Sequence, residues 1–383
     1  MTLWDSQIFT AGARAANVDP AVISAAVGHA NAIRSVSIDL PIVFTLTHLA
    51  HLSGVSHRYL IEVAGRGSDP YRDYIAKKRQ APGSTAASRR YRTICMPDPE
   101  LKKVQRWLQQ NMLSKIAPHA ASTAYSEDDT VFAAAARHVN ARWLIKIDIE
   151  RFFESIKEPY VASVFERLGY PDLLSFQLGR LCTRLPTLKS RKDIFKRRSK
   201  PARGVMQHEW IGFLPQGAPS SPQLANLVMR RFDRRATAAA KKAGLRYSRY
   251  SDDMIFSTAG SFSRERAEHF VHDIYDVLGA YGFEANRTKT SIAAPGARKI
   301  VLGLLVDRDK PRLTREFRAG IETHLHYLER PDVGPVGHAE VREFDSVIGL
   351  RNHLEGLVAF ARQIDQPYGD RLKARLRAIV WPA

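Results

Sequence analysis

Two adjacent aspartates, Asp252 and Asp253, lie between two apolar, strand-like runs, and this feature constrains the fold more than any other. The runs cover residues 245–250 and 254–256. Two short strands around a tight acidic turn predict a β-hairpin that presents carboxylate oxygens to a cation. Paired aspartates are also common in surface loops, so this pair becomes informative only together with a second acidic element.

That second element is Asp148, which lies upstream near the carboxyl end of a predicted strand. Residues 143–149 are apolar enough to form a buried strand. A buried carboxylate must be paired or bound to a metal, because an isolated one is too costly. Two divalent ions held about 3.5–4 Å apart by carboxylates from two strands would clamp the oxygens of a phosphoryl transfer. Magnesium fits because it prefers oxygen ligands.

The chain is strongly basic, which points to a polyanionic partner. Lys and Arg number 58 against 39 Asp and Glu, giving a formal net charge of +19 over 383 residues. A hydrophobic content of 44% supports a sizeable core and excludes a disordered chain. No apolar run reaches about 18 residues, and no secretion or lipidation signal is evident. Nucleic acid is therefore favoured over a membrane as the partner.

The two cysteines do not indicate a zinc site. Cys95 and Cys182 form no CxxC pair and cannot hold zinc by themselves. We expect two buried free thiols in a reducing compartment, which favours the cytoplasm.

The first hundred residues predict helices followed by a hairpin. Residues 1–66 have helical spacing, and 97–116 form an amphipathic helix. Between them, residues 71–75 and 89–94 alternate like paired strands with a basic tip. The tip is either a solvated charged loop or a flap that grips a triphosphate or a template backbone through Lys77, Lys78 and Arg92.

Further elements continue to the end of the chain. Residues 212–222 form a sharp Gly- and Pro-containing loop with Gln216 at its rim, and a helix follows from 223 to about 242. Before this loop, a Lys- and Arg-rich segment reads as an exposed insertion. After the aspartate pair we expect the following elements: a helix over 263–281, a strand after Lys289, an apolar strand over 300–306 and a basic helical segment over 311–383.

The order of these elements resembles the successive palm motifs of reverse transcriptases. The motifs are the Asp148 strand, Leu-Pro-Gln-Gly-Ala-Pro-Ser-Ser-Pro at 214–222, Tyr-Ser-Asp-Asp at 250–253, Gly-Phe-Glu-Ala-Asn-Arg-Thr-Lys-Thr at 282–290 and Leu-Gly-Leu-Leu-Val at 302–306. The resemblance covers roughly residues 46–383. It is specific because five motifs occur in the right order and spacing.

This resemblance implies an α+β, right-hand polymerase fold. It places an N-terminal helical extension at 1–66, fingers at 67–142, an antiparallel-sheet palm at 143–310 and a helical thumb at 311–383. The basic insertion, 186–210, would lie within the palm.

The resemblance also implies roles for individual residues. Asp148, Asp252 and Asp253 would hold two Mg²⁺ ions with the backbone carbonyl of Ile149, and Lys289 would act as general acid. Phe153 would reject a ribose 2′-hydroxyl sterically, which makes deoxynucleotides the substrate. Four further residues would bind the nucleotide: Gln216, Lys77, Lys78 and Arg92.

Within the superfamily, the chain looks most like bacterial retron enzymes. Pro-Gln-Gly-Ala-Pro-Ser-Ser-Pro at 215–222 matches their loop, and Leu-Lys-x-x-Gln-Arg-Trp at 101–107 echoes their fingers. Two positions tied to RNA handling depart from the retron pattern. Retron enzymes usually carry Asn-Ala-x-x-His before the first aspartate strand, and here Ala134 replaces the asparagine of the motif that ends at His138. They also usually carry Val-Thr-Gly where this chain has Leu302 between Val301 and Gly303.

A retron-type enzyme would copy part of a structured noncoding RNA into DNA, leaving a joined RNA–DNA product called msDNA. Its partners would be that RNA, the cDNA, deoxynucleotides and a separate effector protein in antiphage defence. Two alternatives stay open. One is another bacterial defence or group II-like reverse transcriptase without msDNA synthesis, and the other is a noncatalytic nucleic-acid-binding protein.

Overall fold

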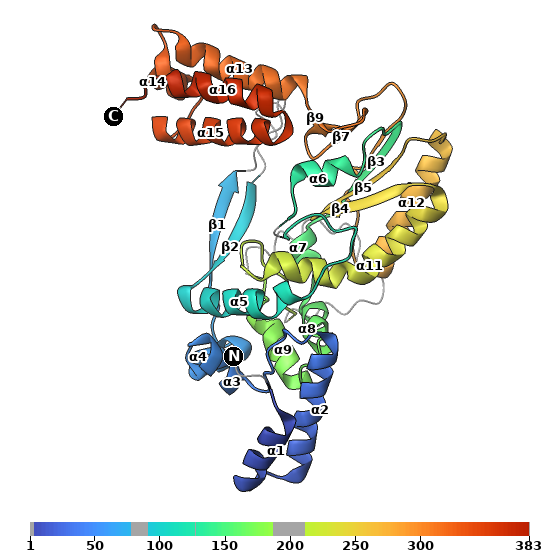
Figure 1. The fold of residues 1–383 in the computed structure, drawn as a ribbon, viewed down its shortest axis with the longest axis vertical. Coiled ribbons are helices and arrows are strands. Elements are labelled where there is room, and N and C mark those ends of the chain that lie inside the picture. Colours follow the sequence, from blue (N-terminus) through green and yellow to red (C-terminus); the bar gives the residue numbers. More distant parts are fainter. Residues whose placement is uncertain (1–3, 78–90, 127, 187–210, 383) are drawn as a thin grey trace.

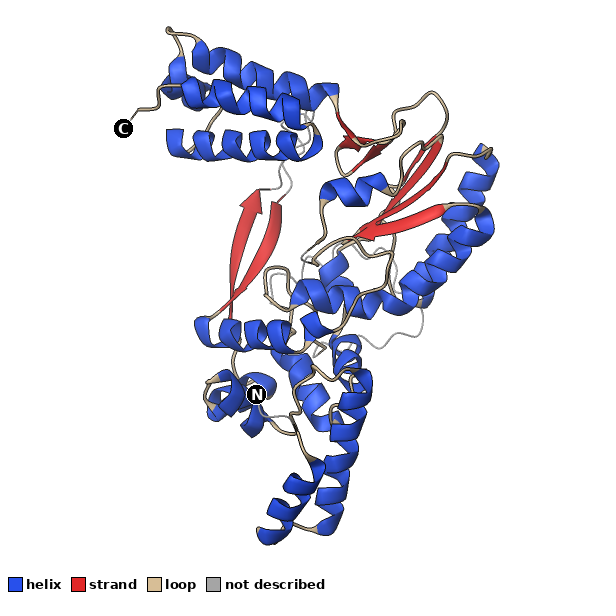
Figure 2. Cartoon of the chain, viewed as in Figure 1, coloured by secondary structure: helices blue, strands red, loops and turns tan. Residues whose placement is uncertain are grey.

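The computed structural model describes residues 4–77, 91–126, 128–186 and 211–382. The described chain is elongated, with C-terminal helices at one end, N-terminal helices at the other and a β-sheet between them (Figure 1). Helices and strands are combined in one molecule, as the α+β class requires (Figure 2). The fold class predicted from the sequence is confirmed.

The N-terminal helices begin where side chains can cap them. Asp5, Asp19 and Thr45 each accept a hydrogen bond from a backbone N–H in the first turn of the helix that follows. The helical character expected before residue 66 is confirmed, while the boundary of the extension stays a prediction. The four helices are α1 (Ser6–Ala15), α2 (Pro20–Val36), α3 (Leu46–Ser53) and α4 (His57–Ala64).

A two-stranded antiparallel ribbon follows these helices. β1 (Tyr71–Lys77) pairs with β2 (Tyr91–Pro97) along seven residues each. Asp98 then caps α5 (Pro99–Asn111) by accepting the Leu101 N–H. The expected hairpin and amphipathic helix are therefore confirmed, although Lys78 and the tip of the hairpin lie outside the described residues.

The central sheet has four antiparallel strands in the order β4-β5-β3-β6. Alternate residues of its middle strands enter two different cores. Ile145 and Met254 belong to the main core, whereas Leu144 and Ile255 belong to a second core. The strands are β3 (Trp143–Asp148), β4 (Arg246–Tyr250), β5 (Asp253–Thr258) and β6 (Ser291–Ala293).

Helices lie against both faces of this sheet (Figure 2). The main core joins the sheet to α11 (Ser221–Ala243) and α12 (Arg264–Ala280), which match the helices expected over 223–242 and 263–281. The second core joins it to the C-terminal helices. Four shorter helices complete this region: α6 (Val131–Ala136), α7 (Phe152–Ser155), α8 (Glu158–Arg167) and α9 (Asp172–Leu181).

The single strand expected over residues 300–306 is wrong. The structure has two short strands there, β7 (Ile300–Val301) and β8 (Leu304–Leu305), paired antiparallel. Leu302 and Gly303 adopt positive φ angles of 49° and 84°, which turn the chain back on itself. β9 (Arg312–Leu313) then pairs with β8.

The C-terminal segment is helical, as expected. Its helices pack around Leu325, Leu354 and Leu372, which are buried in the second core. Their bounds are α13 (Arg315–Glu329), α14 (Gly334–Val341), α15 (Val347–Ile364) and α16 (Gln366–Ala378).

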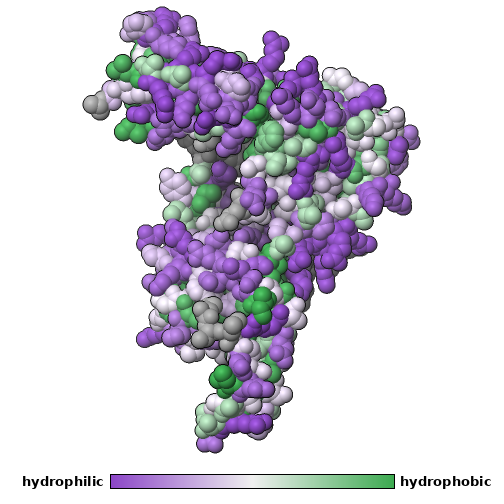
Figure 3. All heavy atoms as spheres, in the orientation of Figure 1, coloured by the Kyte–Doolittle hydropathy of each residue, from purple (hydrophilic) through white to green (hydrophobic). Residues whose placement is uncertain are grey.

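Hydrophilic residues cover much of the molecular face seen in Figure 3, in keeping with the charge of the chain. Apolar residues gather near the end formed by α1 and α2, where Ile8 and Val22 are exposed. No helix within the described residues has the length and apolar character needed to cross a bilayer.

Candidate active site

The carboxylates singled out in the sequence meet at one edge of the sheet. In the register of β3 and β5, Asp148 lies directly opposite Asp253. Ser251 has a φ of 59°, which gives the tight turn between β4 and β5. The Ile149 N–H donates a hydrogen bond to the Asp252 carbonyl at 3.0 Å, so the turn is fixed to the end of β3. Asp148 and Asp253 therefore lie opposite each other, with Asp252 next to them in the turn.

The charges of these groups influence one another. Burial raises the pKa of Asp252, and the negative charge of Asp148 raises it further. Burial and the neighbouring Asp252 raise the pKa of Asp253 to about 6. Lys289 Nζ lies 2.6 Å from Asp148 Oδ2, forming an ion pair at the same edge. Negative charge thus exceeds the positive charge that the site supplies.

The donor set suits a hard divalent cation, since it consists of carboxylate oxygens. Within the described chain, no three His, Cys, Asp or Glu side chains are gathered as a ready-made metal site. The Lys289 ammonium instead pairs with the Asp148 carboxylate, which a bound cation would also contact. The carboxylates therefore suit a cation in ligand type and in their position at the strand ends, but they do not form a complete coordination shell.

A loop after α12 delivers Lys289 to Asp148. Asn286 N–H donates to the Asp148 carbonyl at 2.7 Å, and Lys289 N–H donates in turn to the Asn286 carbonyl. Glu150 N–H donates to the Glu284 carbonyl at 2.8 Å. The motif at 282–290 therefore wraps around the end of β3, which explains how a lysine distant in sequence reaches the site.

A fully buried ion pair supports the turn from behind. Arg249, on β4, is 0% exposed and makes two hydrogen bonds to Asp233 of α11, at 2.9 and 2.7 Å. Its Nη1 also donates to the Ser251 carbonyl at 2.9 Å. The Tyr247 hydroxyl donates to Asp233 as well. Arg249 thus connects the acidic turn to the longest described helix of the central region.

The aromatic side chain expected to contact the sugar lies beside a second aromatic residue. Phe153, at the start of α7, is half-buried, and its ring centroid is 6.5 Å from that of Tyr125. The Tyr125 hydroxyl donates a 2.6 Å hydrogen bond to Ser251 Oγ. Tyr125 therefore links Phe153 to the turn that carries the aspartates.

The loop with Gln216 packs against the ribbon. Cys95 N–H donates to the Gln216 carbonyl at 2.7 Å, and the Gln216 side chain is half-buried. Gly217 has a φ of 115°, and a Cβ there would lie 2.7 Å from Ile94 and 3.0 Å from the Cys95 carbonyl oxygen. Glycine is therefore required for the loop to approach β2 so closely.

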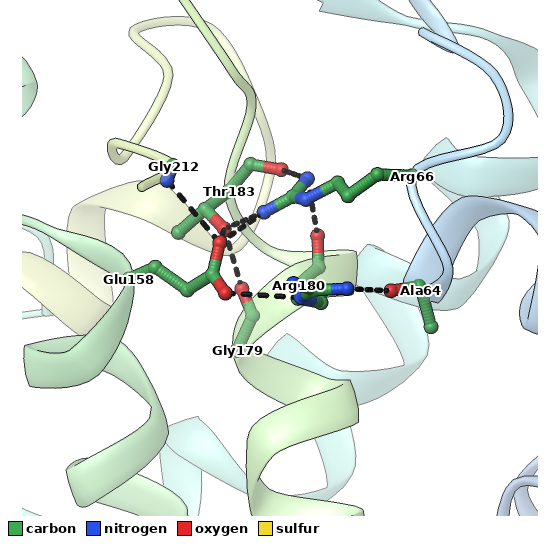
Figure 4. Close-up of polar contacts among 7 residues, drawn as sticks. All are labelled: Ala64, Arg66, Glu158, Gly179, Arg180, Thr183 and Gly212. Carbon is green, nitrogen blue, oxygen red and sulfur yellow. Dashed lines mark hydrogen bonds and ion pairs between the residues drawn. The ribbon is translucent and has the colours of Figure 1, made fainter. Parts of the chain in front are cut away.

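A buried carboxylate anchors the start of this loop. Glu158 accepts hydrogen bonds from Arg66 at 2.5 Å, from Arg180 at 3.1 Å and from the Gly212 N–H at 3.2 Å (Figure 4). Thr183 lies within the same cluster and accepts from Arg66 at 2.7 Å. The loop that carries Gln216 is thereby tied to the segment after α4 and to α8 and α9.

A Gly212→Ala variant is expected to lose stability. A Cβ at this position would lie 2.6 Å from Arg66 Nη2, 2.7 Å from Glu158 Oε2 and 2.8 Å from Thr183 Oγ1, so the cluster must move. We expect a loss of about 1–3 kcal/mol in the free energy of unfolding, measured with urea.

Gly279→Ala is the matched control, because a Cβ there meets nothing within 4 Å and the residue lies in α12. That change is expected to stabilise the protein by about 0.5–1 kcal/mol. Equal stability of the two variants would contradict a tight anchor at Gly212.

Other residues singled out in the sequence lie apart from the carboxylates or have no exposed surface. Arg92 is exposed on β2, opposite Ala76, and Lys77 pairs with Tyr91 in the ribbon. Lys78 lies outside the described residues, as does nearly all of the basic insertion 186–210. Arg92 has no ion-pair partner among described residues.

His138 holds two strands together. It is 0% exposed, and its ring nitrogens lie 2.7 Å from Ser257 Oγ of β5 and 2.7 Å from Ser248 Oγ of β4. Burial lowers the pKa of His138 to about 3, so the ring is neutral. His138 is thus enclosed between two strands, and its part in RNA handling stays a prediction.

Val301 and Gly303 lie in the β7–β8 hairpin. Val301 is 0% exposed in the second core, whereas Gly303 is exposed in the turn. Their part in RNA handling stays a prediction.

Sequence reasoning missed Arg249, Glu158 and Tyr125. Glu158 bonds to Arg66 and Tyr125 bonds to Ser251, and both contacts join segments far apart in the chain. The available signal was Arg249 itself, an arginine two positions before Ser251 within a predicted strand. A buried strand position that carries a charge requires a partner.

Comparison of the sequence with known proteins identifies its family. Residues 75–328 match the reverse transcriptase (RNA-dependent DNA polymerase) family. The chain is 26% identical over 340 residues to the retron Ec86 reverse transcriptase of Escherichia coli, covering 88% of this chain and 95% of that protein.

Two relatives from Myxococcus xanthus are longer than the matched region. The retron Mx162 reverse transcriptase is 29% identical and the retron Mx65 reverse transcriptase 30% identical, each over 74% of this chain. The matches span 57% and 61% of those proteins. A telomerase structure from Candida albicans overlaps 82% of this chain at 12% identity with a TM-score of 0.40, too distant to bear on the assignment.

The family match covers more than half of the chain and includes every carboxylate at the sheet edge. The retron relatives extend the similarity along most of the remainder. The chain therefore belongs to the reverse transcriptase family and is an RNA-directed DNA polymerase of the retron type.

Proposed function

We propose that this polymerase copies part of a structured noncoding RNA into DNA, yields msDNA and acts with an effector protein in antiphage defence in the cytoplasm. The observation that carries the polymerase chemistry is the strand register that sets Asp148 opposite Asp253. The similarity to retron enzymes along most of the chain supports the choice of template and product.

In this proposal, Asp148, Asp252 and Asp253 hold two Mg²⁺ ions, helped by the Ile149 carbonyl. Bound there, the ions neutralise charge that develops as the primer hydroxyl attacks the α-phosphate of a deoxynucleotide. Because Lys289 contacts Asp148, its ammonium is placed to donate a proton to the leaving pyrophosphate once nucleotide enters. Of the proposed triphosphate ligands, Lys77 and Arg92 belong to the ribbon and Lys78 follows it, and Gln216 lines the nucleotide pocket.

Phe153 is proposed to select deoxynucleotides sterically. A Phe153→Ala variant is expected to lower the preference for dNTP over rNTP by about a hundredfold, because space opens for the 2′-hydroxyl. The measurement is the ratio of kcat/KM values for matched dNTP and rNTP incorporation. Phe176→Ala, an exposed aromatic position of α9, is the control and should keep the preference. Unchanged sugar selectivity in the Phe153 variant removes its proposed role.

The template and product are tested by what co-purifies with the protein from its native host. A branched species containing both RNA and DNA, shortened by ribonuclease and by deoxyribonuclease, is the expected result. An Asp252→Ala protein should carry the RNA without the DNA. Departures from the retron pattern before His138 and at Leu302 favour a second candidate, a defence reverse transcriptase without msDNA. DNA synthesis that leaves no RNA joined to its product would support that candidate instead.

A further inference from the structure

A basic groove lies between α3 and α5, in the N-terminal part of the molecule. Its volume is about 430 Å³. Both helices lie apart from β3 and β5, which carry the carboxylates (Figure 1). The residues that line the groove are Ser53, Pro99, Lys102, Lys103, Arg106, Trp107 and Gln110.

The cations of this groove have no counter-ion among the described residues. Lys102 and Arg106 lie one turn apart on α5, and neither pairs with another described residue. Lys103 donates to the Gly54 carbonyl at 2.7 Å, which is a neutral partner. None of the described lining residues is acidic. Like charges one turn apart disfavour the helix, so the fold itself gains nothing from this arrangement.

The groove in the C-terminal helices provides the contrast. It is also lined by arginines, but Arg351 pairs with Glu355 at 3.0 Å and Arg362 pairs with Asp370 at 2.6 Å. Carboxylates thus pair with these two arginines, although Lys373 and Arg377 of the same groove pair with no other described residue. The α3–α5 groove therefore retains positive charge that an external anion can neutralise.

A buried hydroxyl also faces this groove. Ser53 is only 5% exposed, lines the groove and has no hydrogen-bond partner for its Oγ. Buried hydroxyls in folded proteins are nearly always hydrogen bonded. The other polar groups that line the groove are mostly donors, which favours a ligand rich in acceptor oxygens such as a phosphate.

Trp107 adds an aromatic surface beside the cations. It is half-buried, packs against the main core and also lines the groove. A positively charged groove with an aromatic side chain is the combination that holds single-stranded nucleic acid, because unpaired bases stack on the ring while phosphates meet the cations. A duplex keeps its bases stacked internally and would leave Trp107 without a partner.

We propose that this groove binds a single-stranded nucleic-acid segment outside the active site. Lys102 and Arg106 contact its phosphates, and a base stacks on Trp107. The proposal rests on the proposed function only in that the polymerase must hold a strand that extends beyond its active site. RNA template and DNA product share this chemistry, and the experiment separates them.

The test measures binding of labelled single-stranded RNA and DNA of the same sequence by fluorescence anisotropy at several salt concentrations. The Lys102→Ala/Arg106→Ala variant removes two phosphate contacts. Its plot of log Kd against log salt should lose about 1.4 in slope, because each single-strand contact contributes about 0.7. The strand that shows this loss, RNA, DNA or both, is the strand that the groove accepts.

The Lys241→Ala/Lys242→Ala variant controls for net charge, since both residues are exposed near the end of α11. Its slope should change by less than half as much. Trp107→Leu keeps an apolar side chain toward the core and should weaken binding at least about fivefold. Unchanged slopes in the α5 variant for both strands, or an equal loss in the control, would overturn the proposal.

Primer extension on a short pre-annealed template and primer is measured in parallel. Wild type and the Lys102→Ala/Arg106→Ala variant should extend it at the same rate. If the wild type synthesises DNA but the salt dependence of Kd is unchanged in the variant, only the proposed binding groove is rejected. Failure of wild-type synthesis on every template instead rejects the polymerase chemistry, so the two outcomes are distinguishable.

Discussion

Asp252→Asn and Asp253→Asn variants are expected to lose about a thousandfold or more of the primer-extension rate. Each substitution keeps the side-chain shape but removes a carboxylate charge at the edge where β3 and β5 meet. Charge stabilisation of the transition state by bound ions amounts to several kcal/mol, and each 1.36 kcal/mol is tenfold in rate. Single-turnover incorporation of the first deoxynucleotide is the measurement. Undiminished synthesis by either variant rejects the proposed metal site.

Stability separates this chemistry from misfolding. Burial raises the pKa of both carboxyls, so at neutral pH each negative charge opposes folding of the metal-free protein. The Asn variants should therefore unfold at a higher urea concentration than the wild type while losing activity. Asp276→Asn, at an exposed position of α12, should change neither property.

Arg249→Met is expected to lower the free energy of unfolding by about 3–5 kcal/mol, because Asp233 would be left buried without its cation. Both side chains of this pair are 0% exposed. The Ser251 carbonyl would lose its donor too, so we also expect slower incorporation. Urea unfolding and single-turnover extension measure the two effects.

Two further variants serve as controls, one that removes both charges of the pair and one that breaks an exposed ion pair. The double variant Arg249→Met/Asp233→Leu should recover most of the lost stability, because it removes both charges. Arg264→Met breaks an exposed pair with Glu268 and should cost less than about 1 kcal/mol. A loss for Arg249→Met no greater than for Arg264→Met would contradict a structural role for the buried pair.

Much of this fold follows from local sequence patterns. Helices such as α11 and α12 are evident from apolar spacing and the residues that flank them, because each depends on neighbours in the chain. The strand expected over 300–306 failed because apolar residues alone do not reveal a reversal. Leu302 adopts a left-handed conformation that its residue type disfavours, and only the glycine after it marked the turn.

The site divides in the same way. The aspartates were predictable because the turn and the strand end carry them in recognisable motifs. The residues that hold them in place were not, because Arg249 bonds to Asp233 and Tyr125 bonds to Ser251 through contacts set by tertiary packing. His138 shows the opposite case, since a conspicuous residue in the sequence is fully enclosed between two strands.

The second core has a consequence for how this enzyme can be divided. Leu144 and Ile255, on one face of the sheet, share that core with Leu325 and Leu354 of the C-terminal helices. The C-terminal helices are thus no detachable appendage, since cutting them away would leave apolar residues of this shared core, such as Leu313 of β9, in contact with water. We expect a fragment that ends before Arg315 to aggregate rather than to fold into an enzyme of lower activity.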